Sequence, residues 1–273
     1  MKIMICMSDY FTATNLGRWE YTRICLMSLK SLGMNYAEVY IHSNPLASHL
    51  VDYKSRLLQE FTTENFRIIW QEVSLDNWLH LCWQHKNLLP YYLESNFDLF
   101  IYTENDYCWY RHHLDYFMSS RQTFRSQDLN HIPGFLRTEI TMHNTVVSVD
   151  WQNMPGYAHL KSINVQGDLW YSSKFPYQGL MILDKELAVE HVTSYWSDVH
   201  TALSISPWPT LETSNAGLIW HNVPQGFEHR IVINPKYIDA CTIYHLPNKY
   251  VQNPTNEPYS TIPITDFKIS MAP

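Results

Sequence analysis

An apolar, strand-length run followed at once by two carboxylates constrains this chain more than any other feature. The run covers residues 97–103 and carries no charge after Asp98. Such a segment is typical of a strand buried on both faces, as in the middle of a parallel sheet. Glu104 and Asp106 follow at the point where the strand should end. Because ligands of open α/β sheets bind beyond the carboxyl ends of the strands, we expect the functional site there.

The two carboxylates allow two interpretations. Glu104 and Asp106 are hard oxygen donors of the kind that hold Mg²⁺ or Mn²⁺ while the phosphates of a substrate complete the coordination shell. An acidic residue after a strand is also a common turn former or helix N-cap, and this simpler interpretation of Asp106 stays open.

The first hundred residues alternate between strand-like and helix-like segments. Strand patterns cover residues 2–7, 38–42 and 66–70, and helical spacing covers residues 18–32, 46–61 and a helix that Asp76 would cap. This rhythm predicts βαβ units and a mostly parallel central sheet flanked by helices. The later pattern is less regular. Residues 132–139 and 145–149 predict strands of a mixed sheet, residues 177–184 and 230–233 predict further short strands, and helices are predicted at 112–124, at 185–196 and from 212 onward. We predict a single α/β domain.

Nucleotide-binding glycine motifs are missing from the sequence. It contains neither G-x-G-x-x-G nor G-x-x-x-x-G-K-[ST], and it has 8 glycines in total. This argues against a dinucleotide dehydrogenase or a P-loop enzyme. It favours a site at which a metal ion holds the phosphates.

Charge and cysteine content exclude further classes. The net charge is −7 and no Lys/Arg cluster could follow a phosphate backbone, so we expect no nucleic-acid partner. The five cysteines have no metal-ligand spacing and are typical of reduced thiols in a cytoplasmic protein. No run approaches the roughly 18 apolar residues that a transmembrane helix needs, so we expect no transmembrane segment.

Five blocks of the sequence resemble one family. Residues 97–106 resemble the strand and DxD element of GT-A glycosyltransferases. Residues 83–86, 133–139, 177–180 and 245–250 are similar to further blocks of a group of these enzymes, which includes a rhamnosyltransferase domain of large algal viruses and microbial homologues. The blocks occur in order over most of the chain. The resemblance implies a Rossmann-like GT-A fold, with a donor-binding half at about residues 1–109 and an acceptor-binding half at about residues 110–273.

The resemblance also implies a reaction and a metal site. A nucleotide diphosphate sugar would be the donor, a carbohydrate or glycan the acceptor, and Mn²⁺ or Mg²⁺ the cofactor. Asp106 is implied as the direct metal ligand, Glu104 as a contact to the ribose or the metal, and His245 as a further ligand, although a lone histidine is more often structural. Asn105 departs from the family pattern, because an acidic residue is frequent there, and this reduces the negative charge of the site.

Position along the strands suggests the residues that would bind the nucleotide. Cys6, Met7 and Ser8 end the first strand and Asn44 follows the second, so their loops should line the base and ribose pocket. Lys86 could pair with the pyrophosphate as a point charge, or it could be a solvated helix lysine.

An acceptor hydroxyl also needs a base. An inverting enzyme places a carboxylate on the face of the sugar opposite the leaving group. Glu212, near a predicted helix start, is our candidate for this catalytic base, and its alternative role is to complement the helix dipole. Asp150, Glu139 and Asp168 are rivals.

Two other functions compete with glycosyl transfer. A sugar-nucleotide nucleotidyltransferase shares the parallel sheet and the metal, but its glycine- and arginine-rich N-terminal phosphate loop is missing here. A carbohydrate-binding protein that retains the fold with a damaged site is the non-enzymatic alternative, and Asn105 is its only hint.

Overall fold

The computed structural model describes residues 1–12, 17–149, 160–172, 176–206, 208–252 and 262–264. The chain divides into two compact units, which we call the first unit (Met1–Tyr107 with Gly179–Leu218) and the second unit (Cys108–Gln178 with Ile219–Pro273). The predicted halves differ from these units in one segment, Gly179–Leu218, which lies late in the sequence but belongs to the first unit.

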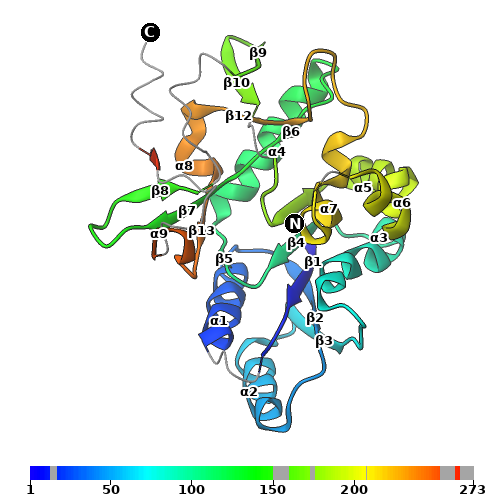
Figure 1. Cartoon of the computed structure of the whole chain (residues 1–273), viewed down its shortest axis with the longest axis vertical. Helices are drawn as coiled ribbons and strands as arrows, with labels where there is room; N and C mark the ends of the chain where they lie inside the picture. Colours follow the sequence, from blue (N-terminus) through cyan, green and yellow to red (C-terminus); the bar gives the residue numbers. More distant parts are fainter. Residues whose placement is uncertain (13–16, 150–159, 173–175, 207, 253–261, 265–273) are drawn as a thin grey trace. The chain divides into compact units, whose positions relative to one another are not determined.

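The first unit contains a mostly parallel sheet, as the sequence predicts. Among the described residues its strand order is β11-β4-β1-β2-β3 (Figure 1). Neighbouring strands from β4 to β3 run parallel, and β11 pairs antiparallel with β4. The bounds are β1 (Lys2–Asp9), β2 (Tyr36–Ser43), β3 (Phe66–Glu72), β4 (Leu99–Glu104) and β11 (Leu180–Leu183).

This strand order reverses direction beside β1. The chain moves outward from β1 through β2 to β3, and then returns to place β4 on the other side of β1. Ser8 pairs with Glu104, so the carboxyl ends of β1 and β4 lie next to each other. The crevice at such a reversal is the usual ligand site of an open α/β sheet.

Apolar burial fixes the centre of this sheet. Ile3, Met4 and Ile5 of β1 and Phe100 and Ile101 of β4 are fully buried, as expected for strands covered on both faces. The helical elements of the first unit are α1 (Gly17–Lys30), η1 (Ser48–Leu50), α2 (Val51–Phe61), η2 (Trp78–Gln84), α3 (His85–Glu94), α5 (Lys185–Thr193), η4 (Tyr195–Ser197), α6 (Val199–Ile205) and α7 (Thr210–Ala216).

One predicted helix start is wrong. Asn77, not Asp76, is the N-cap, and its side chain accepts a hydrogen bond from the backbone N–H of Leu79. The segment begins with the 3₁₀ turns of η2, in which Trp78 is 45% exposed. The following helix, α3, contains Pro90 on its exposed side and continues to Glu94.

The second unit contains mixed sheets, also as predicted. Among the described residues the strand orders are β6-β12-β10-β9 and β14-β8-β7-β13-β5. The strands are β5 (Tyr107–Cys108, which begins at the last residue of the first unit), β6 (Ile132–Pro133), β7 (Leu136–Ile140), β8 (Val146–Ser148), β9 (Ser162–Val165), β10 (Asp168–Ser172), β12 (Ile231–Ile233), β13 (Thr242–His245) and β14 (Ile262–Pro263). The helical elements are α4 (Arg111–Ser126), η5 (Gly217–Trp220, spanning the boundary between the units in the chain), η6 (Pro235–Tyr237), α8 (Ile238–Cys241) and α9 (Lys249–Gln252).

The predicted strand at residues 132–139 is two strands in different sheets. It is interrupted at Gly134, where an added Cβ would lie 2.4 Å from the side chain of Ile231. The absence of a side chain therefore allows the close approach of β12 at the point where the chain leaves one sheet for the other.

Across the described residues, none of the helices combines the length and the apolar character needed to cross a membrane.

Candidate active site

A buried polar network lies where β1 and β4 end. Asp9, the last residue of β1, is 1% exposed. Its Oδ1 accepts a hydrogen bond from Asn105 Nδ2 at 2.8 Å, and its Oδ2 lies 2.5 Å from Thr22 Oγ1 of α1. Asn105 Nδ2 also lies 3.0 Å from Thr22 Oγ1, and its Oδ1 accepts from Arg18 at 3.3 Å. The network ties α1 to the carboxyl ends of both central strands.

Asn105 has a specific role in this network. It is fully buried, and both ends of its amide are engaged. An acidic residue at this position would place a further negative charge beside Asp9 and remove the donor that Asp9 and Thr22 use. Asn105 is therefore suited to its surroundings, and it gives no sign of a damaged site.

The environment of Asp9 favours its neutral form. Burial raises its pKa to about 8, and the negative charge of Asp106 adds to the increase, although Thr22, Arg18 and Asn105 oppose it. Thr22 Oγ1 also lies 3.1 Å from the carbonyl oxygen of Arg18. The single Thr22 hydroxyl proton can be donated to Asp9 Oδ2 or to that carbonyl oxygen.

This raised pKa predicts the pH dependence of stability. The unfolded chain loses the Asp9 proton near pH 4 while the folded protein keeps it to about pH 8, so the folded state binds more protons in between. The free energy of unfolding should therefore fall as pH rises through this window, by at most about 1.4 kcal/mol per pH unit from this residue. Asp9→Asn reproduces the hydrogen bonds of the neutral acid and should remove this slope.

Urea unfolding at pH 5, 6 and 7 in EDTA measures how the free energy of unfolding changes with pH in the unaltered protein and in Asp9→Asn. Asp115→Asn, at an exposed ion pair with Arg111, is the matched control and should keep the slope of the unaltered protein. Parallel pH profiles for the unaltered protein and Asp9→Asn would show that Asp9 is ionised after folding.

Glu104 and Asp106 lie at the same strand end. Glu104 closes β4 and is partly exposed, and Asp106 is 7% exposed. Asp106 is close enough to Asp9 for its charge to raise the Asp9 pKa. No group of three or more His, Cys, Asp or Glu side chains suited to a metal ion occurs within the described part of the chain. Carboxylates at 104 and 106 nevertheless fit a Mg²⁺ or Mn²⁺ ion whose remaining ligands come from phosphates and water.

The predicted nucleotide-binding residues near β1 and β2 have structural partners. Cys6 and Met7 are buried, and Cys6 Sγ lies 3.4 Å from His42 Nδ1, so these two residues would meet a ligand only through their backbone. Ser8 Oγ lies 2.8 Å from the hydroxyl of Tyr102. Asn44 binds both backbone groups of Phe11, at 2.7 and 2.9 Å, and so joins the loop after β2 to the loop after β1.

Lys86 is held by the protein and is not a solvated lysine. Its ammonium donates to the carbonyl of Trp196 and lies 4.0 Å from the centre of the Trp83 ring. Burial lowers its pKa to about 7. A contact with pyrophosphate would require Lys86 to exchange the Trp196 carbonyl for the ligand, and this role stays a prediction.

Glu212 lies in the first turn of α7 and belongs to the first unit. Its Oε2 atom is buried and has no hydrogen-bond partner among the described residues. Burial raises the pKa of Cys82 to about 12, and the charges of both Glu104 and Glu212 contribute to this increase. Both carboxylates therefore lie near Cys82, which brings the predicted base to the neighbourhood of the predicted metal ligand.

Two aromatic residues that the sequence analysis did not select stack beside this site. Tyr10 directly follows Asp9, and its ring lies 4.6 Å from that of the exposed Trp78 at an interplanar angle of 24°. The signal that could have found Asp9 and Tyr10 is their position. They follow the apolar run of β1 as Glu104 follows that of β4.

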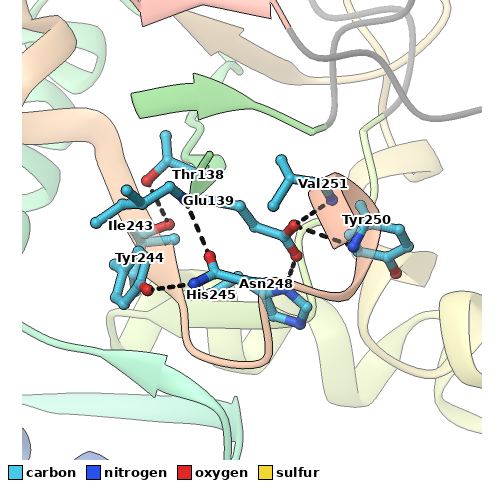
Figure 2. Close-up of polar contacts among 9 residues, drawn as sticks. Thr138, Glu139, Ile243, Tyr244, His245, Asn248, Tyr250 and Val251 are labelled. Carbon is cyan, nitrogen blue, oxygen red and sulfur yellow. Dashed lines mark hydrogen bonds and ion pairs between the residues drawn. The ribbon is translucent and has the colours of Figure 1, made fainter. Parts of the chain in front are cut away.

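The second unit holds His245 in a separate network with Glu139 (Figure 2). His245 Nδ1 lies 2.6 Å from Glu139 Oε1, and the two side chains are 1% and 0% exposed. Glu139 Oε2 accepts hydrogen bonds from the backbone N–H groups of Tyr250 and Val251, at 3.0 and 2.9 Å, in α9. Three donors thus surround one buried carboxylate.

This network assigns different roles to the two residues. A carboxylate on Nδ1 fixes the ring orientation and leaves Nε2 as the acceptor nitrogen, which is the arrangement that metal-binding histidines commonly have. Glu139 is fully committed to these contacts and is a poor candidate for a base. Asp168 pairs with Lys236, and Asp150 lies outside the described residues. His245 lies in the second unit and Glu104 and Asp106 in the first.

Comparisons with known proteins find similarity in structure only. No family model and no curated protein matches the chain. The structure is similar to S. aureus TarS 1-349 (10% identity, TM-score 0.44, covering 90% of this chain and 60% of that chain) and to a longer S. aureus TarS structure (9%, 0.48, 100% and 42%). It is also similar to mouse xyloside xylosyltransferase 1 (12%, 0.45, 90% and 98%). Because these TM-scores are low, we assign the fold class from the strand order and strand pairing of the sheets described above and not from these similarities.

Proposed function

We propose that this protein is a glycosyltransferase that moves a sugar from a nucleotide diphosphate sugar to a carbohydrate acceptor with the help of Mn²⁺ or Mg²⁺. The observation that carries the proposal is the convergence of Asp9, Glu104 and Asp106 at the strand reversal between β1 and β4. Hard oxygen donors at this edge suit a cation that binds phosphates. The resemblance of residues 97–106 to the GT-A element supports the same conclusion.

The chain's own residues would bind and orient the donor. Tyr10 and Trp78 offer a ring face on which a nucleobase can stack. Glu104 and Asp106 would hold the cation, which when bound supplies electrostatic stabilisation of the charge that develops on the departing diphosphate. Asp9 and Asn105 would keep the ends of β1 and β4 in register beneath it.

The acceptor would be activated by Glu212. A base must accept the proton of the attacking hydroxyl, and Glu212 Oε2 is a buried carboxylate oxygen with no hydrogen-bond partner in the described structure. A buried polar atom normally has a partner, so an acceptor hydroxyl is a natural candidate for it. This role predicts inversion at the anomeric carbon.

A screen of ligands tests the proposal against its two rivals. Thermal unfolding with nucleoside diphosphates and nucleotide sugars, with and without Mn²⁺, should show a Mn²⁺-dependent increase in Tm. A carbohydrate-binding protein with a damaged site would show no such increase. Turnover of the stabilising sugar nucleotide should release a nucleoside diphosphate, whereas formation of a sugar nucleotide and pyrophosphate from a nucleoside triphosphate and a sugar 1-phosphate would identify a nucleotidyltransferase.

We expect His245→Ala to weaken Mn²⁺ binding by about 10–100-fold, as the loss of an accessory ligand or its support commonly does. Glu139→Gln should have a similar effect, because a glutamine amide facing Nδ1 would move the ring proton to Nε2. Titration of free Mn²⁺ by electron paramagnetic resonance measures the affinity, and ¹⁵N NMR reports the His245 tautomer.

His143→Ala is the matched control, since His143 is exposed in the same unit. An unchanged Mn²⁺ titration in His245→Ala would assign His245 a structural role alone. An unchanged tautomer in Glu139→Gln would refute the positioning role of Glu139.

A further inference from the structure

A second concave site lies in the second unit, on the β6-β12-β10-β9 sheet. Its volume is about 530 Å³, within the usual range for small-ligand pockets. One wall is the turn between β9 and β10 with the first residues of β10, and the other is the segment that leaves β12 and enters α8. Asp168 and Leu169 line the first wall, and Asn234, Lys236 and Asp239 line the second.

The polar side chains of this pocket are held in place. Lys236 Nζ lies 3.0 Å from both carboxylate oxygens of Asp168, so an ion pair joins the two walls. Asn234 is 1% exposed, and its Oδ1 accepts a hydrogen bond from the backbone N–H of Lys236. Its Nδ2 is a buried donor without a partner among the described residues. A buried donor of this kind normally has a partner, and Asn234 lines the pocket, so a small shift of its side chain would let a ligand acceptor pair with Nδ2.

The pocket also has an apolar side. Leu169, which lines the first wall, is 43% exposed, and Tyr237, which is 39% exposed, follows the lining residue Lys236 without lining the pocket itself. Lys236 Nζ lies 5.5 Å from the centre of the Tyr237 ring, so the ammonium borders the aromatic surface. A ligand here would meet both hydrogen-bonding groups and hydrocarbon.

Charge and donor content select the class of ligand. Two carboxylates against one ammonium give the lining a net charge of −1, which disfavours phosphates and other anions. A metal cation carries no hydrogen-bonding groups of its own and an ammonium group carries donors only, so either would leave Asn234 Nδ2 unpaired. A pyranose has hydroxyls that donate and accept, and its C–H face packs on apolar surface.

We propose that this pocket binds a pyranose unit of a neutral glycan. The inference stands on the pocket alone and does not depend on the proposed transferase activity.

Binding can be measured without donor or metal. We would titrate the full chain, in EDTA, with maltohexaose, cellohexaose, chitohexaose and mannohexaose, followed by saturation-transfer NMR. At least one should bind at millimolar concentration. Leu169→Ala and Asp168→Asn should each weaken it by about tenfold, since a hydrogen bond to a charged group contributes of this order.

Two control variants outside the pocket show whether a loss of binding is specific to the pocket or follows from any change at the surface. Val146→Ala removes a side chain with the same exposure as Leu169, 43%, from β8 of the same unit, and Asp115→Asn breaks an exposed ion pair on α4. Both should bind the oligosaccharide as the unaltered protein does. Failure of all four oligosaccharides, equal binding by the pocket variants, or displacement by uridine diphosphate or inorganic phosphate would each overturn the proposal.

Discussion

Asp106→Asn should lose nearly all sugar transfer, roughly 10³-fold or more in kcat/KM, because metal stabilisation of a departing phosphate supplies several kcal/mol. Nucleotide binding should also lose its dependence on Mn²⁺, since an amide oxygen is a weaker ligand for a hard cation than a carboxylate. The substitution is nearly isosteric and removes a charge that raises the Asp9 pKa, so the protein should stay folded. Calorimetric titration of a nucleoside diphosphate with and without Mn²⁺ measures the loss directly.

The control for this variant lies at the other end of the same strand. Asp98 precedes β4, and its carboxylate accepts a hydrogen bond from the backbone N–H of Lys2 at 2.7 Å. Asp98→Asn should therefore transfer sugar at a rate close to that of the unaltered protein. Full activity in Asp106→Asn, or a Mn²⁺ dependence equal to that of the unaltered protein, would remove Asp106 from the metal site.

The central sheet could be predicted because its signals are local. The apolar runs of β1 and β4 and the helical spacing between them indicate parallel strands without knowledge of the partners. Proximity of Glu104 and Asp106 to the sheet edge followed from their place in the sequence. The same reasoning should have included Asp9, which ends β1 directly after Ser8, the residue that pairs with Glu104 of β4.

The contacts that give these residues their properties could not be predicted, because they join distant parts of the chain. Asn105 interacts with Asp9 across 96 positions, and His245 with Glu139 across 106. Nothing near Asn105 in the sequence reveals that its amide donates to a buried acid whose pKa is raised. Family resemblance alone therefore presented Asn105 as a departure from the pattern.

Short strands in the second unit were missed for a related reason. The hairpin of β9 and β10 turns through Gln166 and Gly167, which both have positive φ. The strands themselves are half exposed, so their apolar pattern is weak, and the pairing of β10 with β12 stabilises them. The pocket proposed to bind a glycan depends on this pairing.

Glu212→Gln should transfer sugar about 10²–10⁴ times more slowly than the unaltered protein, the usual effect of removing a general base. Its affinity for nucleotide with Mn²⁺ should be nearly unchanged, because the base faces the acceptor. Glutamine keeps the size of the side chain but cannot accept the proton. A role in complementing the helix dipole predicts a different result, since such charges contribute only about 0.3–1 kcal/mol to stability and none to the chemical step.

Glu186→Gln distinguishes these roles, because Glu186 is likewise an acidic residue in the first turn of a helix, α5, of the same unit. It should retain full turnover, whereas Glu212→Gln should not. The product also reports on the mechanism, since direct displacement with one base inverts the anomeric carbon and an α-linked donor should give a β linkage by NMR. An α product would refute inversion. Full activity in Glu212→Gln would transfer the role to Asp150, because Glu139 and Asp168 are already engaged by His245 and Lys236.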